Sequence, residues 1–188
     1  MAAVIVHAPD GGHAVLNADT FLSVVSAAPL VAVDLVLVRG GCEILLGLRN
    51  NRPAQGCWFV PGGRIRKDEP IQAALARLAA NELGLQLAAL PHAPTLMGAF
   101  EHFYPDCFAG SAENVGVSTH YVVLGHLLHV PANFALPGFD AQHAELRWWP
   151  MPEAQASPAV HRFTKDYVAS YFLSTEKLLG QYPRGLEV

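Results

Sequence analysis

The chain has 188 residues, of which 52% are hydrophobic and 15% are charged, and its formal net charge is −4. This length and composition suit one compact domain with a buried core, and they exclude a disordered binder. The net charge provides no basic field for nucleic acid, although a local group of arginines can still bind a phosphate.

The first predicted element is a helix that follows a short N-terminal extension, residues 1–16. The stretch "NADTFLSVVSAA" (17–28) predicts this helix. Asn17 or Asp19 is suited to cap its first turn, and Pro29 is suited to stop it.

A hairpin is predicted next. The β-branched apolar runs 30–38 and 42–48 are joined by Arg-Gly-Gly, which is typical of two antiparallel strands with a tight turn. Residues 50–58 lack such a pattern and are expected to form a loop. The following stretch "WFVPGG" (58–63) predicts a short strand that ends in a turn.

The hydrophobic period changes after Pro70, which fits the first turn of a helix. Ile71, Leu75 and Leu78 recur at helical spacing, and Gly84 stands where a C-terminal glycine ends a helix. A helix is therefore predicted between Pro70 and Gly84.

The C-terminal half predicts three strands and a last helix. The strands are expected at 94–104, 118–130 and 146–151, and the helix at 158–178. This order mixes helices and strands without the regular alternation of a doubly wound fold. We take residues 17–156 as one domain. Residues 157–188 carry no chemistry that the sequence identifies, and their helix belongs to the same domain or forms a dimer contact.

The sequence also predicts where the protein works. The opening "MAAVIV" lacks the basic flank of a secretory signal, and the apolar run 29–38 is too short to span a membrane. Cys42, Cys57 and Cys107 are an odd number without metal-ligand spacing, which favours reduced thiols. We therefore expect a soluble, cytoplasmic protein.

The helix after Pro70 carries few acids on the face that could bind metal. Residues 78, 81 and 82 stand at i, i+3 and i+4, so their side chains share one face. Only Glu82 is acidic, since the other two are Leu78 and Asn81. Mg²⁺ prefers oxygen ligands and keeps several waters. One carboxylate with a carbonyl, an amide oxygen and substrate phosphates therefore suffices for one ion, but it is not an obvious set for two.

The stretch that contains this helix resembles the Nudix hydrolase signature G-x5-E-x7-R-E-U-x-E-E-x-G-U, in which U is aliphatic. The residues that match it are Gly63, Glu69, Arg77, Glu82, Gly84 and Leu85. Leu78 and Asn81 depart from it. This departure, with "NRPAQGCWFVPGG" upstream and "FDAQHAELRWW" downstream, is similar to the GDP-mannose mannosyl hydrolase branch. The resemblance covers residues 16–149.

The resemblance implies a Nudix α/β/α sandwich with a mixed central sheet. It also implies hydrolysis of GDP-mannose, or a related GDP-sugar, by attack of water on C1 of the sugar with inversion. One Mg²⁺, for which Mn²⁺ can substitute, would be held by Glu82, Gln142 and the carbonyl of Gly62. His143 would be the general base, and an imidazole with an ordinary pKa near ~6.5 suits that task near neutral pH.

Two arginines are expected at the leaving group. Arg49 follows a predicted strand and Arg64 follows the Gly-Gly turn, so both can face a diphosphate with their forked donors. The resemblance supports both as contacts to the leaving diphosphate. Arg52 fits a role in loop structure and a role in ligand binding equally well.

Two further charged residues are expected to support the metal site without binding metal. Arg77 is expected to orient Glu82. Glu69, near the start of the helix, is expected to support the loop or the helix dipole.

Besides Arg49, which is also predicted to bind substrate, five further residues are predicted to contact it. Asp34 interrupts an apolar strand, where a charge must be paired or functional. A salt bridge at the sheet edge and a sugar contact are the alternatives, and the resemblance favours the sugar contact. By resemblance His102 lies near the sugar and Tyr121 near the β-phosphate, although each also fits strand packing. Phe21 and Leu16 match the guanine pocket, but Phe21 fits the core equally well.

Two rival functions are left open. An ordinary Nudix pyrophosphohydrolase would split a P–O bond of a nucleoside diphosphate derivative, whereas a non-catalytic nucleotide-binding module would retain the signature without the reaction. The retained Glu82, Gln142 and His143 argue against the second rival. The expected partner is a small nucleotide sugar, with neither nucleic acid nor membrane, and the resemblance implies a homodimer.

Overall fold

The computed structural model describes residues 16–107, 117–134 and 143–180. Within these ranges the strands form one seven-stranded sheet in the order β3-β2-β1-β6-β5, with β4 paired to β1 and β7 paired to β2. The strands are β1 (Leu30–Arg39), β2 (Glu43–Arg49), β3 (Trp58–Phe59), β4 (Gly62–Arg64), β5 (Thr95–Tyr104), β6 (Thr119–Val130) and β7 (His143–Pro150).

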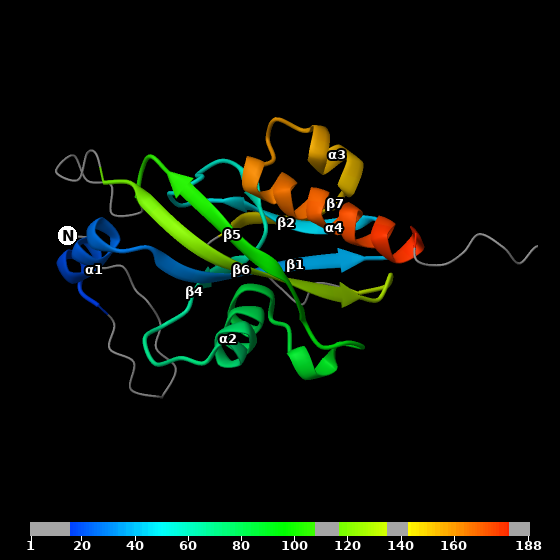
Figure 1. The fold of residues 1–188 in the computed structure, drawn as a ribbon, viewed down its shortest axis with the longest axis horizontal. Coiled ribbons are helices and arrows are strands. Elements are labelled where there is room, and N and C mark those ends of the chain that lie inside the picture. The colour runs from blue at the N-terminus through cyan, green and yellow to red at the C-terminus, as the bar shows by residue number, and fades with distance from the viewer. Residues whose placement is uncertain (1–15, 108–116, 135–142, 181–188) are drawn as a thin grey trace, which may run out of the picture.

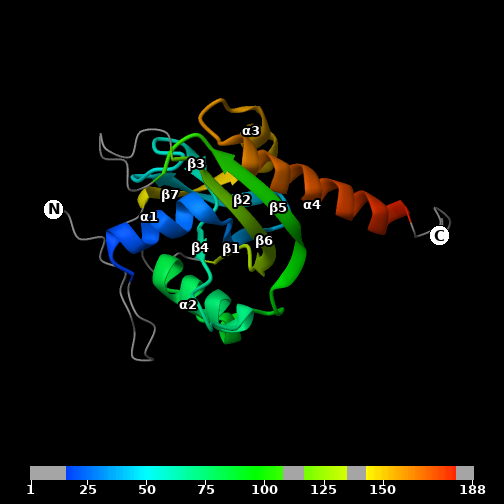
Figure 2. The same ribbon diagram turned by 60° about the vertical axis from the view of Figure 1, so that its left-hand side comes forward.

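Helices cover both faces of this sheet (Figure 1). One face carries α2, the other carries α3 and α4, and α1 lies at one end of the sheet, as the turned view in Figure 2 also shows. The helices are α1 (Ala18–Ala27), α2 (Ile71–Leu83), α3 (Met151–Ala156) and α4 (Arg162–Gly180), with a 3₁₀ turn η1 at Leu87–Ala89. This mixed sheet between helices confirms the predicted fold class.

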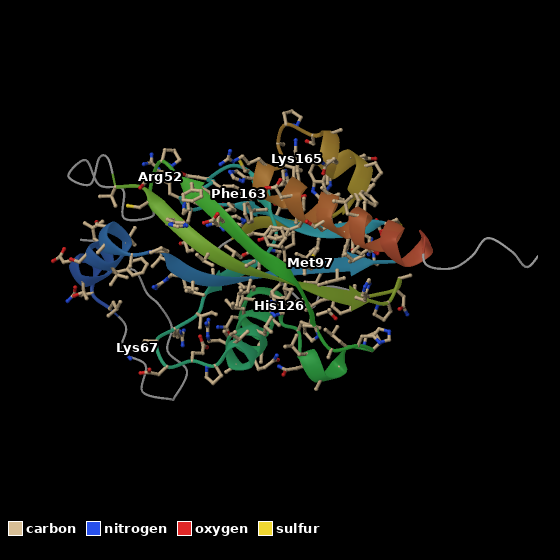
Figure 3. The ribbon with its side chains drawn as sticks, viewed as in Figure 1. Arg52, Lys67, Met97, His126, Phe163 and Lys165 are labelled. Atoms are coloured by element: carbon tan, nitrogen blue, oxygen red, sulfur yellow. The ribbon has the colours of Figure 1, made fainter. Side chains whose placement is uncertain are left out.

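β1 is buried on both faces because it lies in the middle of the sheet. Val33, Leu35 and Leu37 pack with the apolar side of α2, whereas Val36 packs with residues of α4. Because strand side chains alternate between faces, Asp34 lies on the same side as Val36. Figure 3 shows the two sides of the sheet, with Phe163 on the α4 side and His126 on the α2 side.

α2 has the boundaries that the sequence predicts. Pro70 precedes its first turn, and Gly84 ends it with a left-handed backbone at φ 60°. Its buried residues are Ala74, Leu75, Leu78, Ala79, Glu82 and Leu83. The helical period therefore identified the helix, and of the three residues that marked it Leu75 and Leu78 are buried, whereas Ile71 is 43% exposed.

The cap of α1 is Asn17. Its side-chain Oδ1 accepts a hydrogen bond of 2.8 Å from the backbone N–H of Thr20, which is the bond that an N-cap residue makes. Asp19, the alternative cap, lies within the first turn of the helix.

The segment 58–63 differs from the single strand that the sequence predicts. It forms β3 beside β2 and β4 beside β1. Pro61 separates the two strands, because proline has no N–H to offer a strand ladder, while its carbonyl accepts a 2.8 Å hydrogen bond from Leu35 N. The segment therefore changes its pairing partner from β2 to β1 just before Gly62.

β7 and α3 were not fully predicted. β7 begins at His143, before the predicted strand 146–151, and the backbone of His143 pairs with Arg49 of β2 where the register shifts. α3 has six residues, which is too short for a helical period to be recognised.

α4 begins later than the predicted 158. Before it, the chain runs beside β3, since Trp58 N donates to Ala159 O at 2.9 Å and His161 N donates to Trp58 O at 3.0 Å.

No helix in the described part of the chain is long and apolar enough to cross a bilayer. The buried core on the α4 side includes Val160, Phe163, Tyr167, Val168 and Tyr171.

The two glycines of β4 are predicted to respond differently to alanine. A Cβ on Gly62 would lie 2.6 Å from the carbonyl oxygen of Val33, whereas a Cβ on Gly63 would lie 2.7 Å from Cδ2 of Leu78. A leucine methyl can turn away, but the Val33 carbonyl cannot move without disturbing β1. We expect Gly62→Ala to lower the free energy of unfolding by about 2–3 kcal/mol and Gly63→Ala by about 1 kcal/mol or less, as measured by urea titration.

The double variant Gly63→Ala/Leu78→Ala is the control for this comparison. It restores room for the new methyl group, so it should lose no more stability than Leu78→Ala alone. Equal losses for the two single glycine variants would contradict the prediction.

Candidate functional site

The candidate site is built around β4. This short strand lies between α2, which carries the predicted metal ligand Glu82, and Asp34 of β1, a predicted sugar contact. β4 pairs with β1 so that Gly62 lies opposite Asp34. The Asp34 carboxylate oxygen Oδ1 occupies the place that a side chain at Gly62 would fill, while Leu78 of α2 rests against Gly63. The Gly-Gly backbone therefore has α2 on one side and the Asp34 carboxylate close by.

A buried ion pair ties the loop before α2 to the helix. Arg77 donates from Nε to Glu69 Oε1 at 2.6 Å and from Nη2 to Glu69 Oε2 at 2.8 Å, and it also bonds the carbonyl of Arg64 at 2.9 Å. Glu69 Oε2 also accepts a 2.8 Å hydrogen bond from the backbone N–H of Arg66. Hydrogen bonding to Arg77 lowers the pKa of Glu69. The pair fixes the loop geometry between β4 and α2.

The face of α2 next to β4 holds one carboxylate. Glu82 is 2% exposed, and Leu78, one turn earlier, is 4% exposed within the apolar cluster. Asn81 points to solvent as an exposed residue. In the ranges that the structure describes, no three His, Cys, Asp or Glu side chains are grouped to hold a metal. A metal here would have to use Glu82 together with backbone, amide and substrate oxygens.

Two residues of the predicted catalytic centre lie partly or wholly outside the described residues. Gln142 lies outside them. His143 is described by its backbone, which begins β7 and pairs with Arg49. The pairing shows that residue 143 lies at the end of β2 from which Arg49 extends.

Asp34 is a buried carboxylate on an interior strand. It is 6% exposed, and its Oδ2 accepts a 2.7 Å hydrogen bond from the hydroxyl of Tyr167. A salt bridge at the sheet edge, the alternative that the sequence left open, does not describe it. Burial raises the pKa of Asp34 to about 7, although the Tyr167 bond and the positive charge of Arg49 act in the opposite direction.

His102 lies in the same buried group as Asp34. Its ring stacks on Phe163 with centroids 4.1 Å apart and an interplanar angle of 7°. Its Nε2 lies 3.3 Å from the hydroxyl oxygen of Tyr167. Burial, with smaller electrostatic contributions from His161 and Arg162, lowers the pKa of His102 to about 3. The imidazole is therefore neutral near physiological pH.

Arg64, Phe21 and Tyr121 meet at the end of the sheet next to α1. The guanidinium carbon of Arg64 lies 3.8 Å from the centroid of the Phe21 ring, a distance typical of a cation–π contact. Burial lowers the pKa of Arg64 and raises that of Tyr121. Tyr121 packs against the cluster that contains Phe21. The structure thus groups a predicted phosphate contact with a residue predicted to contact guanine.

Arg49, at the end of β2, is held by two contacts. Its Nε donates to the carbonyl of Pro53 at 2.9 Å, and its guanidinium lies 5.9 Å from the Phe59 ring. Its charge lowers the pKa of Asp34. The loop carbonyl and the ring therefore hold Arg49 close enough to the carboxylate to affect it.

Two predicted residues lie apart from these groups. Leu16 is 42% exposed before α1, whereas Phe21 on the helix is buried. Arg52 is exposed and approaches Asp106, with Nε and Oδ2 3.8 Å apart. An exposed pair at this distance contributes little to stability.

Several aromatic residues around Asp34 were not predicted as site residues. The centroid of the Tyr104 ring lies 5.6 Å from that of His161 and 5.3 Å from that of Phe163, and burial lowers the pKa of His161 to about 4. Tyr167 contacts Asp34 from a segment in which the sequence identified no chemistry. Phe163, Tyr167 and Tyr171 have the spacing of any buried helix face, so no sequence signal marked the hydroxyl.

The Glu69–Arg77 pair predicts a pH-dependent stability. The side chains are 6% and 14% exposed, so Glu69→Gln should lower the free energy of unfolding at neutral pH by about 2–4 kcal/mol. Because the folded pKa of Glu69 is below its ordinary 4.5, this contribution is complete above the ordinary pKa and is lost as pH falls through the lowered pKa. Urea titrations at neutral and acidic pH measure the difference from wild type.

Glu101→Gln is the matched control, because that side chain is 67% exposed. It should change the free energy of unfolding little at either pH. A loss in Glu69→Gln that is the same size at both pH values would contradict the proposed origin of the effect.

Comparison with known proteins identifies the family. Residues 28–171 match the NUDIX domain model. The low-salt glycan biosynthesis protein Agl8 of Haloferax volcanii is 37% identical over 145 residues, which cover 77% of this chain and 86% of that protein. The ADP-ribose pyrophosphatase of Methanocaldococcus jannaschii is 29% identical over 117 residues, which cover 62% of this chain and 60% of that protein.

Solved structures share the fold. The MutT protein of Methanosarcina mazei Go1 superposes with a TM-score of 0.61 at 17% identity, over 80% of this chain and 98% of that one. That likeness concerns the fold alone. The family match covers most of the chain and includes the loop–helix segment with Glu69, Arg77 and Glu82. The chain therefore belongs to the Nudix hydrolase superfamily, as its sequence signature predicts.

Proposed function

We propose that the chain hydrolyses GDP-mannose, or a related GDP-sugar, to GDP and free sugar by attack of water on C1 with inversion. The observation that carries this proposal is the side chain at position 78. Leu78 is buried in the apolar cluster between α2 and the sheet. The helix face that would gather several cations for attack on phosphorus therefore retains one buried carboxylate, Glu82.

The donor set fits one Mg²⁺ rather than two. Glu82 would provide a carboxylate oxygen, Gly62 a backbone carbonyl and Gln142 an amide oxygen, and substrate phosphates and water would supply the remaining oxygen ligands. Mg²⁺, or Mn²⁺ in its place, would neutralise negative charge on the departing diphosphate.

Arginines would stabilise the same leaving group. Guanidinium forks bind phosphate oxygens through paired, charge-assisted hydrogen bonds. The half-buried position of Arg64, with its guanidinium carbon over the Phe21 ring, supports this role, because a guanidinium in such a contact retains N–H donors for phosphate oxygens. With Arg49 as the second contact, the diphosphate would leave C1 with little need for a general acid.

A base must then remove a proton from the attacking water. We assign this role to His143, whose imidazole would accept the proton as oxygen bonds to C1 on the face opposite the diphosphate. The pairing of its backbone with Arg49 supports the assignment, since Arg49 is expected to contact the leaving group. Arg77 and Glu69 would support the site by fixing the loop before α2.

The remaining predicted contacts divide the substrate into three parts. Asp34 and His102 are assigned to the sugar and Tyr121 to the β-phosphate. Phe21 and Leu16 are assigned to guanine. The name of the Haloferax volcanii relative, a glycan biosynthesis protein, supports nucleotide-sugar chemistry. The homodimer and the cytoplasmic location stay predictions.

A pyrophosphohydrolase is the second candidate function. The relative from Methanocaldococcus jannaschii that is named an ADP-ribose pyrophosphatase favours it. In that reaction water would attack phosphorus and no free sugar would form.

Hydrolysis of GDP-mannose in ¹⁸O-labelled water separates the two reactions. We expect the label in mannose, because attack on C1 forms a new C–O bond there and leaves GDP unlabelled. Mass spectrometry of both products measures this, and label in a phosphate group would support the pyrophosphohydrolase. GDP-mannose that binds in calorimetry yet stays intact in excess Mg²⁺ would favour a non-catalytic module.

The assignment of His143 predicts a loss of turnover without a loss of binding. His143→Gln should lower kcat by about 10²–10⁴-fold, the usual contribution of a general base, and leave substrate affinity nearly unchanged. His92→Gln, at an exposed position between η1 and β5, is the control and should keep wild-type kcat. A near-wild-type rate in His143→Gln would remove His143 from the mechanism.

A further inference from the structure

Tyr167 bonds two predicted sugar contacts at once. Its hydroxyl donates to Asp34 Oδ2 at 2.7 Å and lies 3.3 Å from His102 Nε2. The exposed fractions of Tyr167, Asp34 and His102 are 0%, 6% and 3%. This contact joins α4 to β1 and β5 through polar groups in the middle of an apolar core.

The Tyr167 hydroxyl has one hydrogen, and this fixes which partner donates in each of its two hydrogen bonds. Because Tyr167 donates to Asp34, its oxygen can only accept a hydrogen bond from His102, and Nε2 of His102 must then carry the hydrogen. A neutral imidazole with hydrogen on Nε2 has Nδ1 as an acceptor. The remaining Asp34 oxygen, Oδ1, lies on the side of Gly62. One hydroxyl therefore fixes both the tautomer of His102 and the orientation of the Asp34 carboxylate.

Close packing holds the ring of Tyr167 in place. A Cβ on Gly125 would lie 2.9 Å from Cε1 of Tyr167, so the glycine makes room for the ring. The Phe100 ring meets Tyr167 edge-on, with centroids 4.5 Å apart and an interplanar angle of 70°. A side chain packed in this way can position a hydroxyl to within about 0.5 Å.

We propose that Tyr167 is a positioning residue for sugar recognition, which holds Asp34 and His102 as one hydrogen-bonded unit that presents acceptors to sugar hydroxyls. The proposal rests on the proposed nucleotide-sugar substrate and does not depend on which bond water breaks. Fixed, buried acceptors discriminate between sugars that differ at one hydroxyl, because a sugar that leaves an acceptor unpaired loses affinity. α4 thereby contributes to sugar specificity.

Tyr167→Phe tests this role, because it keeps the ring and removes the hydroxyl. We expect the affinity for GDP-mannose to fall about 10–100-fold, whereas the affinity for GDP, which has no sugar, should stay within about twofold of wild type. Isothermal titration calorimetry with Ca²⁺ in place of Mg²⁺ measures the two affinities. Chromatography after each titration checks that the nucleotide sugar is intact. A purely structural role would lower both affinities together.

Tyr171→Phe is the matched control. Tyr171 is buried one turn further along α4. Its hydroxyl oxygen lies next to Gly41, at 3.7 Å from the position that a Cβ on that glycine would take, rather than next to Asp34 or His102. Both affinities should match wild type in this variant. A selective loss of GDP-mannose affinity in Tyr171→Phe would contradict a role specific to Tyr167.

Selectivity and coupling provide two further readouts. The ratio of GDP-mannose affinity to GDP-glucose affinity, two substrates that differ at one sugar hydroxyl, should move toward one in Tyr167→Phe. In an Asp34→Ala/His102→Ala background, Tyr167→Phe should change GDP-mannose affinity less than about threefold, because the tyrosine acts through these two residues. Additive losses would overturn the proposal.

The outcomes separate this proposal from the proposed reaction. Equal losses of GDP and GDP-mannose affinity in Tyr167→Phe, or no loss of GDP-mannose affinity, would overturn the positioning role. A wild type that binds GDP-mannose more tightly than GDP but releases no labelled mannose in ¹⁸O water would contradict the reaction alone. A wild type that binds both equally would overturn the positioning role, since no sugar contact would exist to be positioned.

Discussion

The pairing of Gly62 with Asp34 is the constraint on which the candidate site depends. A side chain at residue 62 would collide with the carbonyl of Val33, so β4 can lie against β1 in this way only with glycine there. The same short strand offers Gly63 to Leu78 of α2. One stretch of backbone therefore sets the position of α2, with its buried Glu82, relative to Asp34 and the α4 side. The predicted metal ligand Glu82 and the predicted sugar contact Asp34 are therefore fixed relative to each other before any ligand binds.

The second requirement is electrostatic, because a carboxylate on an interior strand opposes folding unless it is bonded. Tyr167 supplies a hydrogen bond to Asp34 and Arg49 supplies opposite charge, yet burial still raises the pKa of Asp34 to about 7. An apolar residue at this position would pack with Val36 at no such cost. Shifted pKa values of this kind concentrate at functional sites. The burial of Asp34 is therefore unfavourable for stability, which supports its proposed role in recognition.

The features that the sequence predicted are those coded locally. The helix between Pro70 and Gly84 is predicted from its hydrophobic period and its end signals. The structure contains this helix, with Pro70 before its first turn and Gly84 at its end. The break at Pro61 and the start of β7 at His143 depend on which strands pair, so local pattern could not locate them. Tyr167 contacts Asp34 only because α4 crosses the face of β1 that carries Asp34. A contact between residues so distant in the chain has no sequence signal.

Leu78 connects the fold to the proposed chemistry. The residue is buried among apolar side chains such as Leu75 and Leu35, so a carboxylate at this position would lose its hydration and disrupt the packing of α2. Leu78 therefore helps to dock α2 and offers no ligand to a cation, which leaves Glu82 as the carboxylate of this face. With one carboxylate on that face, the negative charge of a diphosphate has to be balanced largely by arginines, and Arg64 already lies on an aromatic ring. A reaction at the sugar carbon requires less charge balance at phosphorus but demands that the sugar be held accurately. The buried tyrosine–aspartate–histidine group beyond β4 is suited to that demand.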